Sequence, residues 1–179
     1  MKKFALILSA LVLALFMVGC GVDDPLNTNK ESVVSEDATL PEVKIDDTKY
    51  DDSIEGIYQY LLDLELVSKS DATEMSAELI GATKGNKYSF KLNGKQVTVE
   101  LYSYDVQNLD DVANDILNSV KNTGKFEILN LGEVEATISE SGKYLMIYSD
   151  DSLKSSKPNS YNVENYNKVL EVFKNFKNK

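Results

Sequence analysis

The side chains of this chain that can take part in chemistry are carboxylates, hydroxyls and lysine amino groups. Asp and Glu number 29, all 19 cationic residues are Lys, and the 179 residues include no His and a single Cys, Cys20. The chain therefore has no imidazole base, no His-containing zinc site, no arginine finger and no internal disulfide. What remains for catalysis is a carboxylate pair or a serine activated by a lysine.

Paired acidic residues are the first candidates: Asp46-Asp47, Asp51-Asp52, Asp110-Asp111 and Asp150-Asp151. Calcium needs about six to eight oxygens from a shaped loop, and the Asp-x-Asp-x-Asp-Gly spacing is missing, so we predict no metal site. Acids at Asp110-Asp111 suit the first turn of a helix. Weak calcium binding at Asp150-Asp151 stays open, as does a glycosidase-like carboxylate pair, because sequence spacing does not fix separation in space.

A glycine-rich segment, Gly81 to Lys87, comes close to a phosphate-binding loop. It has one residue too few between its glycines, Asn86 separates Gly85 from Lys87, and the pattern predicts a helix before it instead of a strand. We interpret it as a helix stop and a loop. Gly-x-Ser-x-Gly and Ser-x-x-Lys are also missing, so we predict no catalytic residue, and a Ser–Lys pair would be recognisable only in the fold.

Three residues form a candidate binding face: Glu100, Tyr102 and Tyr104. They alternate along an expected strand, opposite the face that carries Val97 and Leu101. Exposed tyrosines beside an acid would suit contact with a partner protein or a sugar polymer. The same face can equally lie beneath a helix, and the sequence leaves both arrangements open.

The N-terminus has the layout of an export signal. Lys2 and Lys3 precede an uncharged run from Phe4 to Gly19, which is shorter than the ~20 residues of a spanning helix, and Cys20 follows directly. The segment Met17-Val18-Gly19-Cys20 resembles the lipobox of bacterial lipoproteins. A plain cleaved signal or an uncleaved helix would leave the lone Cys unexplained.

The resemblance covers residues 1–20 only, and no family is recognised in the rest of the chain. It implies that residues 1–19 are a signal peptide and that Cys20 becomes the first residue and carries a diacylglyceryl anchor. The protein would then be held in the cell membrane and face outside the cytoplasm. The acidic, all-lysine composition favours a Gram-positive surface.

Residues 20–49 are expected to be an acidic, flexible tether. Between residues 21 and 49 there are eight acids, three lysines and two prolines, without a sustained helical or strand period. A first strand beginning at Val43 and Ile45 stays open. Residues 50–179 are long enough for one globular domain with its own core.

Hydrophobic spacing predicts the elements of this domain. Asn93-Gly94, between two alternating runs, predicts a tight hairpin, and Asp52 with Glu55 has the form of a capping box. The expected order is α-α-β-β-α-β-β-β-α, which indicates an α+β two-layer sandwich with helices on a largely antiparallel sheet. The helices are expected at 53–66, 70–80, 108–124 (capped by Asn108) and 161–177, and the strands at 88–92, 95–101, 126–131, 133–138 and 143–148.

These features predict a function only in outline. The formal charge of -10 argues against nucleic-acid binding, and no cofactor is expected. Residues 154–179 carry six lysines and two glutamates, which suit either an anionic surface or simply a solvated helix end. We expect a non-catalytic, lipid-anchored binding or accessory module whose partner is an envelope protein or a wall polymer. The alternatives are a cell-surface hydrolase using carboxylates or a Ser–Lys pair, and a purely structural subunit with an exposed apolar patch.

Overall fold

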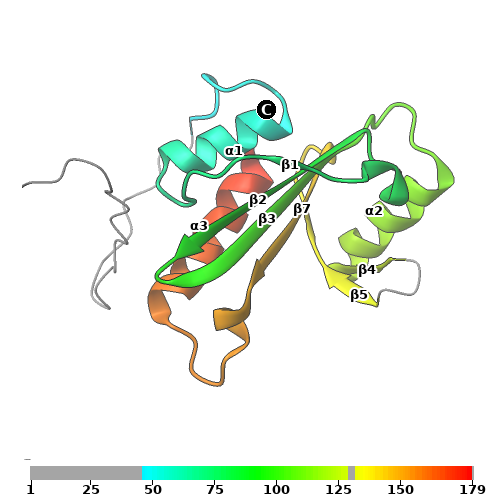
Figure 1. The fold of residues 1–179 in the computed structure, drawn as a ribbon. Helices are drawn as coiled ribbons and strands as arrows, with labels where there is room; N and C mark the ends of the chain where they lie inside the picture. The colour runs from blue at the N-terminus through cyan, green and yellow to red at the C-terminus, as the bar shows by residue number, and fades with distance from the viewer. Residues whose placement is uncertain (1–45, 129–131, 179) are drawn as a thin grey trace, which may run out of the picture. The chain divides into compact units, whose positions relative to one another are not determined.

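The computed structural model describes residues 46–128 and 132–178, which form an antiparallel sheet with helices packed on it (Figure 1). The α+β class and the largely antiparallel sheet are confirmed. The elements are α1 (Ile54–Asp63), β1 (Thr73–Glu74), the 3-10 helix η1 (Ala77–Ile80), β2 (Lys84–Leu92), β3 (Lys95–Ser103), α2 (Asp111–Thr123), β4 (Lys125–Glu127), β5 (Glu133–Glu135), β6 (Thr137–Ile138), β7 (Tyr144–Asp150), the 3-10 helix η2 (Asp151–Lys154) and α3 (Ser160–Asn175).

The main sheet has five strands in the order β1-β2-β3-β7-β6, and β4 and β5 form a separate two-stranded sheet. The hairpin between β2 and β3 is confirmed, with Phe90 opposite Val97 and Tyr88 opposite Val99. Asn93 and Gly94 both have positive φ, 49° and 72°. Two successive positive values are what a type I′ turn requires, so the local sequence sets this register.

Helices pack on both faces of the sheet. Alternate strand residues point to opposite faces, so Leu101 joins one hydrophobic cluster and Tyr102 joins the other. The first cluster lies beneath α1 and α3, and the second lies beneath η1 and α2. The helices are therefore divided between the two faces of the sheet.

The start of α1 differs from the predicted capping box. Ser53 is the N-cap, and its hydroxyl accepts a hydrogen bond from the Gly56 amide at 3.0 Å. Asp52 pairs with Lys143, directly before β7, and Glu55 lies 2.5 Å from the ammonium of Lys84 in β2. A serine can cap with its own hydroxyl, so the carboxylates are free to make charged contacts with distant strands.

The start of α2 is also shifted. Asp110 caps it, because the Asp110 carboxylate accepts from the Ala113 amide at 2.7 Å, and the predicted cap, Asn108, lies outside the helix. Gly124 ends α2 with a φ of 72°, as expected. Several neighbouring Asn and Asp residues can each serve as a cap, so composition alone does not choose between them.

The predicted helix over 70–80 is wrong. Its first half is β1, which pairs with β2 through Thr73 opposite Lys87, and only Ala77–Ile80 forms a short 3-10 helix, ended by Gly81 at a φ of 65°. Pairing with β2 supplies hydrogen bonds that a helix would have supplied locally. Leu79, which the helical pattern places on an apolar face, is 52% exposed.

The predicted strand over 133–138 is divided between the two sheets. β5 pairs with β4, whereas β6 pairs with β7. Between them, the Ala136 amide donates to the Gly124 carbonyl at 2.9 Å, which draws the chain away from β7. β5 and the far end of β7 therefore diverge (Figure 1). The strand predicted over 126–131 is β4, and its residues 129–131 lie outside the described part.

The folded domain includes residues 46–49, which the sequence assigns to the tether. The Asp46 amide donates to the Tyr60 hydroxyl at 2.8 Å. Asp47 is 4% exposed; its carboxylate accepts from the Lys177 backbone amide, and its carbonyl accepts from the Lys177 ammonium at 2.7 Å. Residues 1–45, with Cys20, the expected signal peptide and most of the expected tether, lie outside the described part.

Candidate functional site

The structure decides between the two arrangements of the Tyr-Glu face. Tyr102 and Tyr104 are 6% and 4% exposed and belong to the cluster beneath η1 and α2. The Tyr104 hydroxyl donates to the Ile80 carbonyl at 3.3 Å, and the Tyr102 hydroxyl donates to Glu100 at 3.0 Å. Burial raises the pKa of both hydroxyls. The tyrosines are part of the core and not an exposed contact surface.

Glu100, the third residue of that face, is partly buried. Its side chain is 17% exposed, and its carboxylate lies 3.4 Å from the Lys87 ammonium. Together with the hydrogen bond from Tyr102, this ion pair engages the carboxylate within the protein. The face therefore holds β2 and β3 beneath the covering helices.

Two of the acidic pairs have structural roles. The Asp52 carboxylate accepts from the Tyr144 hydroxyl at 2.7 Å and from the Lys143 ammonium. Burial opposes ionisation of Asp52, but these two bonds outweigh it and lower the pKa. Asp150 is 3% exposed and accepts from the Ser152 amide and the Asn162 amide group, both at 2.8 Å. Within residues 46–128 and 132–178, no three metal-binding side chains converge.

The near-miss phosphate loop becomes the end of η1 and the beginning of β2. Its first lysine, Lys84, pairs with Glu55, and its second, Lys87, pairs with Glu100. The Lys84–Glu55 hydrogen bond raises the pKa of Lys84. Both ammonium groups therefore neutralise carboxylates of the same domain.

The strongest candidate site is a cleft between β5 and β7, which belong to different sheets. Two contiguous hollows, of about 300 and 600 Å³, share four lining residues: Lys125, Glu135, Tyr148 and Tyr166. We call these two hollows together the edge cleft. Its walls come from the β4–β5 sheet, β7 and α3, with further residues from the end of α2, from β6 and from η2, so no single sequence motif encodes it.

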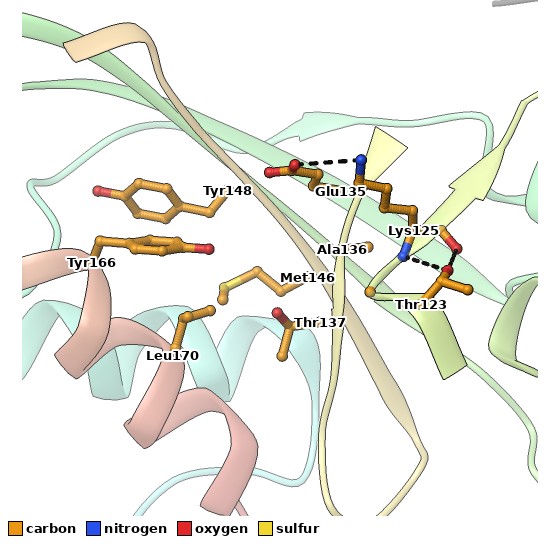
Figure 2. Close-up of a pocket in the computed structure, with 10 residues that line it drawn as sticks. Thr123, Lys125, Glu135, Ala136, Thr137, Met146, Tyr148, Tyr166 and Leu170 are labelled. Atoms are coloured by element: carbon orange, nitrogen blue, oxygen red, sulfur yellow. Dashed lines mark hydrogen bonds and ion pairs between the residues drawn. The ribbon is translucent and has the colours of Figure 1, made fainter. Parts of the chain in front are cut away.

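The two tyrosines form the aromatic wall of the edge cleft. Tyr148 of β7 lies over Tyr166 of α3, with ring centroids 5.0 Å apart and planes tilted by 49° (Figure 2). Met146 and Leu170 extend the apolar lining of the smaller hollow. Burial raises the pKa of both hydroxyls, and for Tyr166 the Glu135 carboxylate adds to it, so both remain protonated at neutral pH.

Charged side chains of β4 and β5 form the opposite rim. The Lys125 ammonium lies 3.3 Å from Glu133 and 3.9 Å from Glu135, so one cation serves two carboxylates. The Glu133 and Glu135 side chains are 69% and 82% exposed. Figure 2 shows Lys125 and Glu135 on the side of the cleft away from Tyr166.

This arrangement is suited to binding. A glycosidase acid needs a carboxyl that burial keeps protonated, whereas both rim glutamates lie in water. A serine-activating lysine needs a desolvated amino group, and the Lys125 side chain is 41% exposed and ion-paired. An aromatic wall facing a polar rim is the usual composition of a ligand cleft.

Sequence reasoning did not find the edge cleft. Tyr166 lies in the helix predicted over 161–177 and Tyr148 in the strand predicted over 143–148, and neither position carries a further signal. The cleft exists because the strand over 133–138 changes partners at Ala136. A long stretch of alternating residues carries no local signal for that change.

Within the described ranges, no helix is both long and apolar enough to span a bilayer. Comparison of the chain with protein-family models, with curated proteins and with solved structures found no match.

Proposed function

We propose that this chain is a lipid-anchored, extracytoplasmic binding module that holds a ligand in the edge cleft and does no chemistry on it. The anchor would be the diacylglyceryl group on Cys20 that the lipobox resemblance implies, and two acyl chains suffice for stable membrane attachment. The ligand would belong to an envelope protein or to a wall polymer, both of which lie within reach of a tethered domain outside the cytoplasm.

One observation carries the binding half of this proposal: a cleft with an aromatic wall and a polar rim, built on rigid elements. Tyr148 lies on β7 of the five-stranded sheet, and Tyr166 lies on α3, which has 16 residues and is the longest described helix. Side chains on such elements are already ordered, so a ligand meets a largely pre-formed surface and little conformational entropy is lost on binding.

Site-specific photocrosslinking tests the binding half. A photoreactive phenylalanine analogue at Tyr166 would lie in the edge cleft, and the same analogue at Asn118, exposed on α2, is the matched control. In membranes of the native host, we expect a crosslinked product from position 166 and none from position 118. Equal products from both positions, or none from either, would contradict a ligand in the edge cleft.

Membrane fractionation tests the anchor. We expect Cys20→Ser to prevent lipid attachment and release the protein from the membrane fraction, since the thiol is the attachment point that the resemblance implies. Thr28→Ser, a similar change in the expected tether, should leave the protein in that fraction. If the Cys20→Ser protein stays in the membrane fraction and the wild type carries no labelled lipid, the anchor is refuted. The proposal of a ligand in the edge cleft would still stand.

A further inference from the structure

Among the described strands, β6 pairs with the outer edge of β7, and it pairs with only two of the seven β7 residues. β6 pairs with β7 at Leu145 and Met146, whereas β7 continues to Asp150. The Tyr144 carbonyl accepts from the Ser139 amide on the β6 side at 2.9 Å. Backbone groups of alternate strand residues face the same side, so Tyr148 also turns its amide and carbonyl toward that edge, beyond the point where β6 ends.

The opposite side of β7 confirms this alternation. The Lys143 carbonyl accepts from the Tyr104 amide at 2.9 Å, on the β3 side. Ser149, which is opposite Thr98 of β3, therefore directs its backbone groups into the sheet, whereas Tyr148 directs its groups into the edge cleft. Exposed strand edges of this kind are templates for pairing with another chain.

Both hollows border this edge at Tyr148, and they differ in which face of β7 adds to their lining. Met146 and Leu170 line the smaller one, whereas Ile147, Val134 and Leu153 line the larger one. An added strand would run about 4.8 Å from β7, and its successive side chains would point to opposite faces. Such a strand would place alternate side chains in the two hollows.

The shape of the edge cleft selects a single extended segment as the occupant. The free edge lies between β5 and the Tyr166 side of α3. A second copy of this chain would bring an edge recessed between the same walls, so the two edges would not meet. A sugar polymer would leave the Tyr148 amide and carbonyl without the regular partners that a peptide backbone supplies.

Charge on the rim selects the side chains of that segment. Glu133 and Glu135 are largely exposed and share a single cation, Lys125. These three side chains leave a net charge of -1, and Lys154, which also lines the larger hollow, pairs with Asp151. A lysine or arginine on the bound segment would neutralise this negative charge.

We infer that β7 binds an extended segment of a partner protein as an additional strand, through the Tyr148 backbone, with a cationic side chain beside Glu133 and Glu135. This inference rests on the proposed function and names the class of its ligand. This mode of binding is β-strand addition, in which backbone hydrogen bonds give affinity and alternate side chains give specificity.

A displayed library of random linear decapeptides, selected on the full chain in detergent, supplies the probe. We expect enrichment of alternating sequences with a basic residue. For the best synthetic peptide, N-methylation of an amide that faces β7 should weaken binding about fivefold, the value of one net hydrogen bond. Methylation of the neighbouring amide, which faces away, is the matched control and should leave the hydrogen bonds to β7 in place.

Amide hydrogen exchange locates the bound peptide. With peptide bound, the Tyr148 amide should exchange more slowly, while the Ser149 amide, directed toward β3, keeps its rate. Glu133→Lys combined with Glu135→Lys should weaken binding about threefold, as for exposed ion pairs, whereas Glu78→Lys on η1 should have no effect.

Three outcomes would overturn the inference: no enriched peptide, binding that is indifferent to the position of the N-methyl group, or an unchanged Tyr148 amide. If position 166 nevertheless gives its specific photocrosslink, the edge cleft binds a ligand of another class and the proposed function stands. If both experiments fail, the proposed binding function fails with the inference.

Discussion

Asp52 joins the start of α1 to the start of β7, and its removal gives the most direct test of the electrostatic reasoning. Its carboxylate accepts hydrogen bonds from the Tyr144 hydroxyl and the Lys143 ammonium, across about half of the sequence. We consider Asp52→Ala, which removes both contacts, with Asp115→Ala, an exposed position on α2, as the matched control.

The expected loss is about 2 kcal/mol of unfolding free energy at pH 7. Tyr144 is 2% exposed, and a hydrogen bond to a charged acceptor contributes about 1.5–3 kcal/mol, the lower part of which suits this partly buried bond. The ion pair adds little, about 0.5 kcal/mol, because the Lys143 and Asp52 side chains are 40% and 43% exposed and water screens them. Asp115→Ala should change stability by less than about 0.5 kcal/mol.

This contribution should depend on pH with a definite sign. The pKa of Asp52 in the folded protein is lowered from its ordinary value of 3.8, because the bonds from Lys143 and Tyr144 outweigh the effect of burial. The stabilisation is therefore fully present above that ordinary value and is lost as the pH falls through the lower, folded-state value. The gap between wild type and Asp52→Ala should narrow on acidification below the ordinary value.

Urea unfolding of wild type, Asp52→Ala, Tyr144→Phe and the double variant measures the coupling directly. We expect a coupling energy of about 1 kcal/mol or more at neutral pH. A coupling below about 0.3 kcal/mol, or a gap between wild type and Asp52→Ala that stays constant with pH, would refute the assigned role of the carboxylate.

Other predictions test the hairpin, the core and the acidic pairs. Gly94→Val should lower the melting temperature, because a β-branched residue resists a φ of 72°, whereas Asn93→Gly should be tolerated; equal melting of both variants would contradict the turn. Leu101→Ala should cost about 2–5 kcal/mol in urea unfolding, since Leu101 is 0% exposed, and a loss below about 1 kcal/mol would contradict its place in the core. Calcium and chelators should leave the melting temperature unchanged, because Asp150 is engaged by Ser152 and Asn162; a calcium-dependent rise would reveal a cation site.

The features that the sequence predicts well are those whose causes are local. Asn93-Gly94 sets the turn, and the alternation on both sides sets the pairs Phe90–Val97 and Tyr88–Val99. Gly124 likewise ends α2 where a left-handed residue is required. In each case neighbouring residues determine the conformation, so no knowledge of distant contacts is needed.

The features that escape prediction depend on distant partners. Thr73 lies in a strand because it pairs with Lys87. Ala136 does not pair with β7, because its amide donates a hydrogen bond to the Gly124 carbonyl. The face of Tyr102 and Tyr104 is covered because α2 folds back over it. Alternation predicts that two residues share a face, but it does not predict which element covers that face.

The candidate site shows the same limit more strongly. Tyr148 and Tyr166 are ordinary residues in their own elements, and they meet only because β7 and α3 pack together. The sequence pattern instead indicates Glu100, Tyr102 and Tyr104 as a binding face, but the two tyrosines lie in the core and the Glu100 carboxylate is paired with Lys87.

The contact between Asp47 and Lys177 has a mechanical consequence. It fastens the point where the chain enters the domain to the C-terminal end of α3, while Tyr166, on the same helix, lines the edge cleft. Lys177 lies just past the end of α3, and the nine residues from Tyr166 to Asn175 span about 14 Å of helix. A pull on the chain at Asp47 would be shared between α1, which follows it in sequence, and α3, whereas a ligand paired with Tyr148 would pull on β7. The two loads would meet where Tyr148 packs on Tyr166.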